Sequence, residues 1–309
     1  MALRDYARRV STATRTGRPV ERVLAERDWI SRRLRHEAAV DALVEGHMVR
    51  RAAGVRHPVE DFLFTYYTHR PAQLRRWHPG VGVALAGDPP HAGWRGYERG
   101  PRGVRVAAAT VRRLEPTVQW VRALLAATAA RPPRLGCFGL HEWAMVYRAG
   151  VEGIRHAGRP LRLGADGTDA VLESLPVACS HFDAYRFFTF EARPLNALRP
   201  TREDQAAQEQ PGCLHATMDL YKWSYKLTPL LPSELVLDCF RLAREVRALD
   251  MRASPYDLAD LGYPPVRVET PEGRAEYVRA QRAFACRGQV LRAALLARLG
   301  RLGVAIGNG

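Results

Sequence analysis

The chain has 309 residues, which is enough for one large domain or two ordinary ones. Lys and Arg number 47 against 32 Asp and Glu, so the formal net charge of +15 favours a polyanionic partner such as DNA. No apolar run of about 18 residues exists, which argues against a membrane span, and the first residues lack the apolar segment of a secretory signal.

The cysteines and lysines narrow the class of protein further. The chain has five cysteines, an odd number, and no CxxC spacing, which argues against both a disulfide framework and a zinc knuckle. A reducing compartment fits this usage, so we expect a cytoplasmic protein. Lys222 and Lys226 are the only lysines, and all other basic residues except the histidines are arginines.

The first half of the chain predicts helices separated by Gly and Pro. Residues 20–53 carry a loose apolar stripe and predict one long helix, with the first 19 residues as a flexible basic N-terminus. The segment 59–70 predicts a second helix, and Pro71 begins a third that ends near Trp77. Residues 79–103 are rich in Gly and Pro and predict a long loop.

The second half continues the helical pattern with one mixed region. Helices are predicted at 110–130, 139–149, 214–227, 233–252 and 271–301, the last with Thr270 as its cap. In the mixed region 160–200, segments 161–164 and 185–192 predict short strands, with the polar segment 167–174 between them.

These elements predict a mainly α-helical fold with a few short strands. We expect a single compact multi-helix domain over residues 20–303, with a possible subdivision near 130–135, and a flexible tail at 304–309. No internal repeat is visible, which argues against a solenoid.

The helix predicted at 214–227 has an unusual distribution of polar residues. His215, Asp219, Lys222 and Lys226 lie at positions i, i+4, i+7 and i+11, on one line of the helix. Apolar and aromatic residues flank this line on both sides, whereas a surface helix normally has a wide polar face. The line therefore indicates either a functional cleft or a simple ion pair, between Asp219 and Lys222 or between Lys222 and a distant carboxylate.

Two other segments place a histidine and a carboxylate within an aromatic run. Residues 139–148 contain His141 and Glu142, and residues 179–188 contain His181 and Asp183. Buried carboxylates are uncommon unless they are paired. Each pair alone is typical of a core network, but together with His215 and Asp219 they predict one shared pocket.

The segment 62–79 interleaves aromatic and basic side chains, which is a pattern found where bases stack and phosphates bind. Several catalytic signatures are absent: the chain has no GxxxxGK[ST], no GxGxxG after a strand, no HExxH and no GxSxG. The deaminase pattern HxE with PCxxC is also absent.

Five segments resemble a known family. Residues 57–80, 139–148, 179–188, 209–223 and 249–258 are similar to segments of actinobacterial proteins named 3-methyladenine DNA glycosylase. The resemblance extends from about residue 20 to about residue 300 of the chain. It implies a DNA-repair N-glycosylase that flips an alkylated, cationic purine into an aromatic pocket and hydrolyses its bond to the sugar with help from a carboxylate.

Site residues for this activity follow from the polar line and the aromatic segments. We expect Asp219 as the first candidate for the catalytic carboxylate, then Asp183 and Glu142, with His215, His181 and His141 beside them. The candidates for the base pocket are Trp143, Tyr185, Tyr221 and Trp223, and those for phosphate binding are Arg70, Arg75, Arg76 and Lys222. A glycosylase of this kind would need no cofactor.

Two alternative functions remain open from the sequence. The three His–carboxylate pairs also fit a metal-dependent hydrolase of a phosphoester or nucleotide, because imidazole and carboxylate suit a divalent metal ion such as zinc, manganese or iron. The metal ligands would then be His141, Glu142, His181, Asp183, His215 and Asp219. A non-enzymatic nucleic-acid-binding protein is the second alternative, since arginines and aromatic side chains alone can bind a polyanion.

Overall fold

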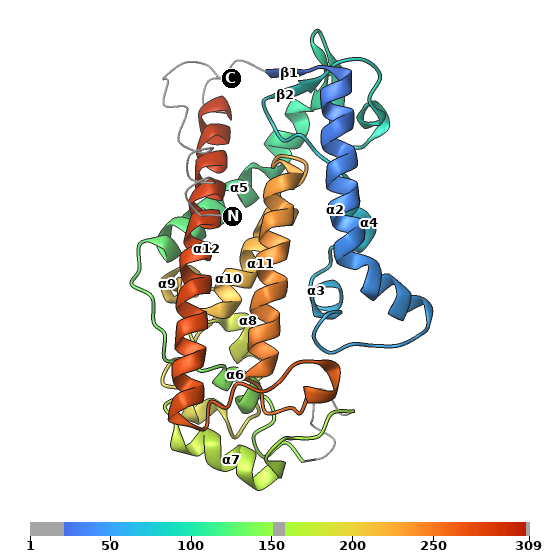
Figure 1. Cartoon of the computed structure of the whole chain (residues 1–309). Coiled ribbons are helices and arrows are strands. Elements are labelled where there is room, and N and C mark those ends of the chain that lie inside the picture. The colour runs from blue at the N-terminus through green and yellow to red at the C-terminus, as the bar shows by residue number, and fades with distance from the viewer. Residues whose placement is uncertain (1–21, 151–157, 307–309) are drawn as a thin grey trace.

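A computed structural model describes residues 22–150 and 158–306 of the chain. The protein is mainly helical, with 57% helix in eleven α-helices and one small four-stranded mixed sheet, and no solenoid is present in the described part (Figure 1). This confirms the predicted fold class. None of the described helices is both long enough and apolar enough to cross a membrane.

Residues 22–150 and 158–306 contain four short strands and eleven α-helices. The strands are β1 (Arg22–Leu24), β2 (Val83–Leu85), β3 (Tyr97–Gly100) and β4 (Gly103–Val106). The helices are α2 (Glu26–Ala52), α3 (Phe62–Thr65), α4 (Pro71–Arg75), α5 (Ala108–Ala129), α6 (Leu140–Ala144), α7 (Gly164–Ser174), α8 (Phe182–Tyr185), α9 (Gln205–Gln208), α10 (Leu214–Lys226), α11 (Ser233–Arg252) and α12 (Pro271–Ile306). Three short 3-10 helices lie at Pro90–Gly93, Arg193–Leu195 and Ala259–Leu261.

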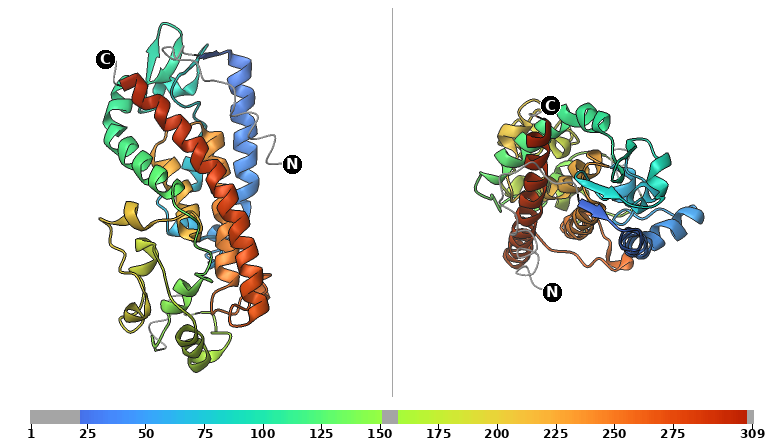
Figure 2. Two further views of the ribbon diagram at one scale, coloured as in Figure 1. Left: turned by 90° about the vertical axis from the view of Figure 1, so that its left-hand side faces the viewer. Right: turned by 90° about the horizontal axis from the view of Figure 1, so that it is seen from above.

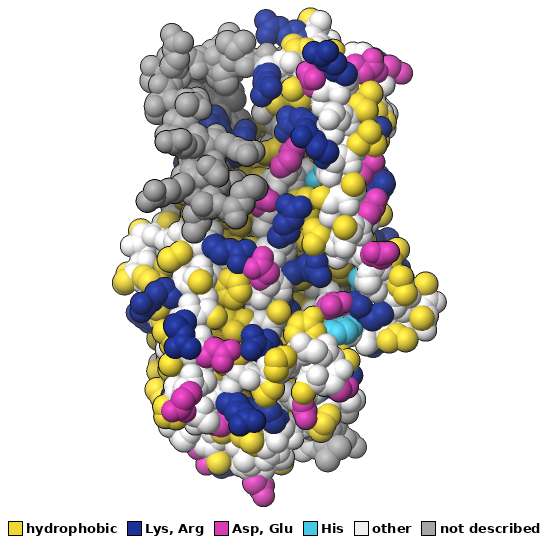
Figure 3. All heavy atoms as spheres, in the orientation of Figure 1, with side chains coloured by type: hydrophobic (Ala, Val, Ile, Leu, Met, Phe, Trp, Pro, Cys, Tyr) yellow, Lys and Arg dark blue, Asp and Glu magenta, His cyan; other side chains and the backbone are white. Residues whose placement is uncertain are grey.

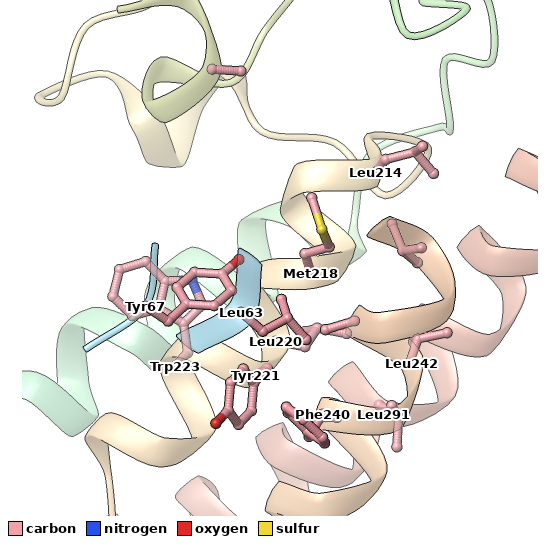
Figure 4. Close-up of a cluster of buried hydrophobic side chains, with 14 of the residues drawn as sticks. Leu63, Tyr67, Leu214, Met218, Leu220, Tyr221, Trp223, Phe240, Leu242 and Leu291 are labelled. Atoms are coloured by element: carbon pink, nitrogen blue, oxygen red, sulfur yellow. The ribbon is translucent and has the colours of Figure 1, made fainter. Parts of the chain in front are cut away.

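Helix α10 lies at the centre of the fold. Every residue from Leu214 to Tyr225 is buried, because α11 and α12 pack against the helix from two directions. The long helices α2, α11 and α12 run along the length of the molecule, and α5 packs against α12 (Figure 2). Tyr221 of α10 contacts Phe240 of α11 with ring centroids 5.1 Å apart, within a large apolar core (Figure 4).

The small sheet lies at one end of the molecule, and α6 and α7 lie at the other (Figure 1). Its strand order is β1-β2-β4-β3; β1 and β2 are parallel and the other pairs are antiparallel. Gly103 begins β4 with a φ of 125°, and a side chain there would collide with the Leu85 carbonyl of β2. The prediction of one long loop over 79–103 was therefore wrong. Strands β2 and β3 lie within it, and Gly103 allows β4 to pair closely with β2.

The mixed region 160–200 also differs from the prediction. Neither 161–164 nor 185–192 forms a strand; Leu161 makes only an isolated bridge to Tyr256. The intervening segment is helix α7, which buries Thr168, Val171 and Leu172. These residues lie at i, i+3 and i+4, which is the spacing of one face of a helix. The polar residues around them made this period hard to recognise in the sequence.

The longer predicted helices are confirmed to within a few residues. The helix predicted from residue 20 begins at Glu26, because residues 22–24 pair as β1, and α12 extends to Ile306, past the start of the predicted tail at 304. Of the segment 59–70, only Phe62–Thr65 is α-helical. The predicted flexible N-terminus at 1–19 and residues 307–309 lie outside the described residues.

The central packing predicts unequal effects for two phenylalanines. Phe240 is fully buried, whereas Phe190 is 81% exposed. We expect Phe240→Ala to lower the free energy of unfolding by about 3–5 kcal/mol, because it removes a ring and leaves a cavity. Phe190→Ala should change it by less than about 0.5 kcal/mol. Denaturant unfolding of both variants checks this, and similar losses would contradict the central role of the α10–α11 interface.

Candidate metal centre

Three buried histidines form a row through the middle of the helical core. His141 belongs to α6, His215 to α10, and His181 immediately precedes α8. The ring centroids of His141 and His215 are 4.5 Å apart, and those of His215 and His181 are 5.2 Å apart. The central ring, His215, therefore contacts both of the others, and a group of carboxylates lies at each end of the row.

At one end of the row, His141 and His215 meet Asp250 of α11, and we call these three residues the first triad. The His141 Nε2 atom lies 2.8 Å from Asp250 Oδ1. The other carboxylate oxygen of Asp250 accepts a hydrogen bond of 2.8 Å from Arg247. Arg247 also donates to Glu142 at 2.7 Å, so one guanidinium holds two buried carboxylates in place.

At the other end, His181 meets Glu209 and Asp219, and we call these three residues the second triad. The His181 Nε2 atom lies 3.4 Å from Glu209 Oε1 and 3.3 Å from Asp219 Oδ2. The Lys222 ammonium donates to the same oxygen of Asp219 and also to Asp183, at 3.1 Å. The remaining oxygen of Asp219 accepts a hydrogen bond of 2.9 Å from the Tyr67 hydroxyl.

Local sequence explains how these side chains come together. In α10 the helical repeat places the predicted polar line together; His215, Asp219 and Lys222 are buried, whereas Lys226 at the end of the helix is exposed. Gly139 precedes α6 with a φ of 71°, a left-handed conformation that turns the chain so that His141 and Glu142 enter the core. The six residues predicted to share one pocket are thus linked by direct contacts, through Arg247, Lys222 and the histidine row.

Burial and neighbouring charges perturb the pKa values of the centre. Burial by itself would raise the pKa of Asp219, but the Lys222 ammonium and His181 outweigh burial and hold that pKa well below its usual value. Burial would likewise raise the pKa of Asp250, which His141 instead lowers. In contrast, burial raises the pKa of Glu209 and lowers the pKa of His215 far below its ordinary value.

The centre contains more buried carboxylates than buried cations in ion-pair contact with them. The cations are Lys222, Arg247 and His141; burial by itself would lower the pKa of His141, but Asp250 raises it. Arg292 is also buried and its charge is attracted by that of Glu209, but it forms no ion pair within the described chain. An uncompensated buried carboxylate is costly, so further positive charge is needed, either as protons or as a bound cation. The buried carboxylates are those of Glu142, Glu209, Asp219 and Asp250.

Each triad has the donor atoms and the spacing for a metal ion. Within each triad, one ligand atom per residue lies within 4.8 Å of the other two. Imidazole nitrogen with carboxylate oxygen is a donor set that Zn²⁺, Mn²⁺ and Fe²⁺ accept. Outer partners are also present: Arg247 orients Asp250, and Tyr67 orients Asp219, in the way that hydrogen bonds commonly fix metal ligands.

A pocket of about 290 Å³ gives access to the histidine row. His215 is part of its wall, so a molecule in the pocket can approach the first triad. The residues that line this aromatic pocket include Phe62, Tyr66, Phe187, Glu142, Asp183, His215 and Arg247. The pocket combines flat apolar rings with charged groups of both signs.

The four aromatic residues predicted to form a base pocket lie elsewhere. Trp143 and Tyr221 are completely buried; the Trp143 indole donates to the Ala253 carbonyl and the Tyr221 hydroxyl is hydrogen-bonded to His69. Trp223 packs edge-on against Trp120, and Tyr185 packs against Phe188. None of the four lines the aromatic pocket, because the interior faces of their helices fill with core side chains; Phe62, Tyr66 and Phe187 line it instead.

The residues predicted to bind phosphates divide into two groups. Arg70, Arg75 and Arg76 are exposed on and beside α4, where Arg75 pairs with Asp41 at 2.8 Å, and none of the three lines the aromatic pocket. Lys222 is instead buried in the second triad, which the apolar surroundings of α10 explain. On the face seen in Figure 3, basic and acidic side chains are interspersed.

Sequence reasoning missed Asp250, Arg247, Glu209 and Tyr67. Arg247 and Asp250 lie at i and i+3 of α11, between buried Val246, Leu249 and Met251. A charged pair within an apolar stripe is the same signal that identified the polar line of α10. Glu209 and Tyr67 carry no such signal, because their loops approach the centre only in the folded chain.

Comparison of the chain with protein-family models, with curated proteins and with solved structures finds no match. We therefore infer the function from the site itself.

The ion network predicts a large effect of one buried cation on stability. Arg247→Met would leave Glu142 and Asp250 buried without their shared cation, so we expect the free energy of unfolding to fall by about 3–5 kcal/mol. Arg241→Met, on the same helix, removes only a partly exposed pair with Asp238 and should cost less than about 1 kcal/mol. Denaturant unfolding measures both; equal losses would show that the network contributes little to folding.

Proposed function

We propose that the protein is a metal-dependent hydrolase of phosphate esters, including nucleotides. The observation that supports this proposal is the pair of buried triads, His141/His215/Asp250 and His181/Glu209/Asp219, whose ligand atoms lie within 4.8 Å of one another in each. Three histidines and three carboxylates gather in this centre, and the four buried carboxylates, Glu142 included, outnumber the cations Lys222, Arg247 and His141 that pair with them.

The metal ion would supply the chemistry that these side chains lack. Bound at a triad, it would lower the pKa of a water molecule and so provide a hydroxide nucleophile at neutral pH. Glu142 and Asp183 line the aromatic pocket and are the candidates for proton transfer during hydrolysis. His215 would connect the metal to the pocket, since it belongs both to the first triad and to the pocket wall.

The shape of the aromatic pocket supports a small substrate with a flat ring. Its volume of about 290 Å³ is at the lower end of ligand pockets. Phe62, Tyr66 and Phe187 can contact a base. Arg247 on the wall is already bound to Glu142 and Asp250, so a bound metal ion would have to balance the charge of a phosphate. The formal net charge of +15 also favours the approach of an anionic substrate.

Metal content is the direct test of this proposal. We expect purified protein to contain about one or two Zn²⁺, Mn²⁺ or Fe²⁺ ions per chain by elemental analysis. Hydrolysis of bis(p-nitrophenyl) phosphate or of nucleoside monophosphates should stop on chelation and return with metal. His215→Ala should weaken metal binding by more than about 100-fold, because it removes a ligand of the first triad.

His57→Asn is the matched control for that experiment. His57 lies outside the centre and its Nδ1 accepts backbone hydrogen bonds from Val59 and Glu60, which an Asn side chain can also accept. This variant should keep its metal content and activity. Metal-free protein that gains no metal from solution, or full activity in excess chelator, would remove the proposal.

A second candidate function is the N-glycosylase implied by the family resemblance. The aromatic pocket supports it, because rings and carboxylates together suit a flat, cationic alkylated base. Asp219 is a poor catalytic group for this reaction. Its side chain is buried, and its two oxygens already bind Tyr67, His181 and Lys222. Asp183 and Glu142, which line the pocket, are the better candidates.

Base release from alkylated DNA in the presence of a chelator distinguishes the two functions. If the protein is a glycosylase, it should release 3-methyladenine without metal, and Asp183→Asn should slow release by at least about 100-fold. Asp260→Asn is the control, because Asp260 is exposed, pairs with Arg159 and does not line the aromatic pocket. Absence of base release from the unmodified protein would exclude this candidate.

A further inference from the structure

The two triads differ in where the nearest buried lysine or arginine binds. This difference affects the order in which the proposed metal ions would bind. In the second triad, the Lys222 ammonium binds Asp219 Oδ2, which is also the oxygen nearest to His181. Tyr67 binds the other oxygen of the same carboxylate. Both carboxylate oxygens of Asp219 therefore already accept hydrogen bonds. The Lys222 ammonium lies next to the position that a metal ion would take.

In the first triad, no lysine or arginine of the described chain binds the carboxylate oxygen that faces the histidines; that oxygen is hydrogen-bonded to His141, which a metal ion would have to deprotonate. Arg247 binds Asp250 through Oδ2, while Oδ1 points to His141 at 2.8 Å. The guanidinium is held away from that oxygen, because it also donates to Glu142 and lies 3.8 Å over the ring of Phe62. A metal ion can thus approach His141, His215 and Asp250 Oδ1 without displacing Arg247, which stays as an outer partner of Asp250.

Lys222 has a second partner that would keep its charge paired if it left Asp219. Its ammonium already donates to Asp183 Oδ2 at 3.1 Å, and Asp183 lines the aromatic pocket. The lysine side chain is flexible over four carbons, whereas Arg247 is held at three points. A shift of Nζ from Asp219 toward Asp183 would free Asp219 Oδ2 for a metal ion.

We propose that the two triads bind metal in order, and that Lys222 controls the second step. The first triad binds the first ion, and the second triad binds a second ion only when the Lys222 ammonium moves from Asp219 to Asp183. Electrostatic repulsion supports this order, since a divalent ion that binds beside the Lys222 ammonium must overcome the repulsion between like charges. This inference rests on the proposed metal centre. It adds that one lysine, Lys222, regulates the binding of the second metal ion.

Titration with Mn²⁺ alone tests the order of binding, and the chain offers a matched control. Lys226, the only other lysine, is exposed one turn further along α10. We expect the unmodified protein and Lys226→Met to take up one tight Mn²⁺ and a second, weaker one. In Lys222→Met the second ion should bind at least about tenfold more tightly, because its competitor is gone. Isothermal titration and equilibrium dialysis measure both steps.

Thermal unfolding tests whether Lys222→Met remains a valid comparison. Without metal, this variant should melt below the unmodified protein, because Asp219 loses its buried cation. Added Mn²⁺ should raise its melting temperature more than that of the unmodified protein, since a ligand that binds the native state more tightly stabilises it more. Adding Asp219→Asn to Lys222→Met should return uptake to a single ion.

Asp183→Asn provides an independent test if Lys222→Met does not fold. This change weakens the alternative partner of Lys222 and should hold the ammonium on Asp219, so the second Mn²⁺ should bind more weakly than in the unmodified protein. Two equally tight ions in the unmodified protein, or unchanged second-ion affinity in Lys222→Met, would overturn the inference and leave the metal centre intact. Failure of the unmodified protein to bind any Mn²⁺, Zn²⁺ or Fe²⁺ would instead overturn the proposed function.

Discussion

The compensation of buried negative charge is the constraint on which the rest of this structure depends. Four carboxylates lie almost completely out of water in the middle of a helical core, and each must be matched by a cation, a proton or hydrogen-bond donors. In the described chain, Lys222 of α10 and Arg247 of α11 pair with them directly, and His141 of α6 pairs with Asp250. Helices α10 and α11 form the central packing of the molecule, so the ion network and the apolar core stabilise the same interface.

This arrangement explains why short, irregular elements are as important as the long helices. The long helices supply His215, Asp219 and Asp250, but His141, His181 and Glu209 come from α6, from the residue before α8 and from the residue after α9. Such segments contain few internal hydrogen bonds and are held by the contacts that their side chains make with the centre. A bound cation would therefore connect segments that lie far apart in the chain, and metal binding would be coupled to their stability.

The aromatic pocket connects this centre with the surface. Its rings and its carboxylates are part of both proposals: they would contact either a phosphorylated substrate beside a metal ion or a cationic base without one. The two chemistries make opposite demands on the centre. A hydrolase needs the triads as ligands, whereas a glycosylase uses them only as a structural network behind the pocket wall.

The sequence by itself determined the helical class and the polar line of α10. Both depend on local periodicity, which a helix preserves whatever surrounds it. The same period placed His215, Asp219, Lys222 and Lys226 on one line, of which the first three are buried and Lys226 is exposed. Tertiary structure alone decided the partners of that line. Asp250 and Glu209 reach the histidines across many residues of chain, and Phe62, Tyr66 and Phe187 became the pocket wall while Trp143 and Tyr221 filled the core. The strands within 79–103 were likewise hidden, because three- and four-residue strands are defined by their pairing and not by their own composition.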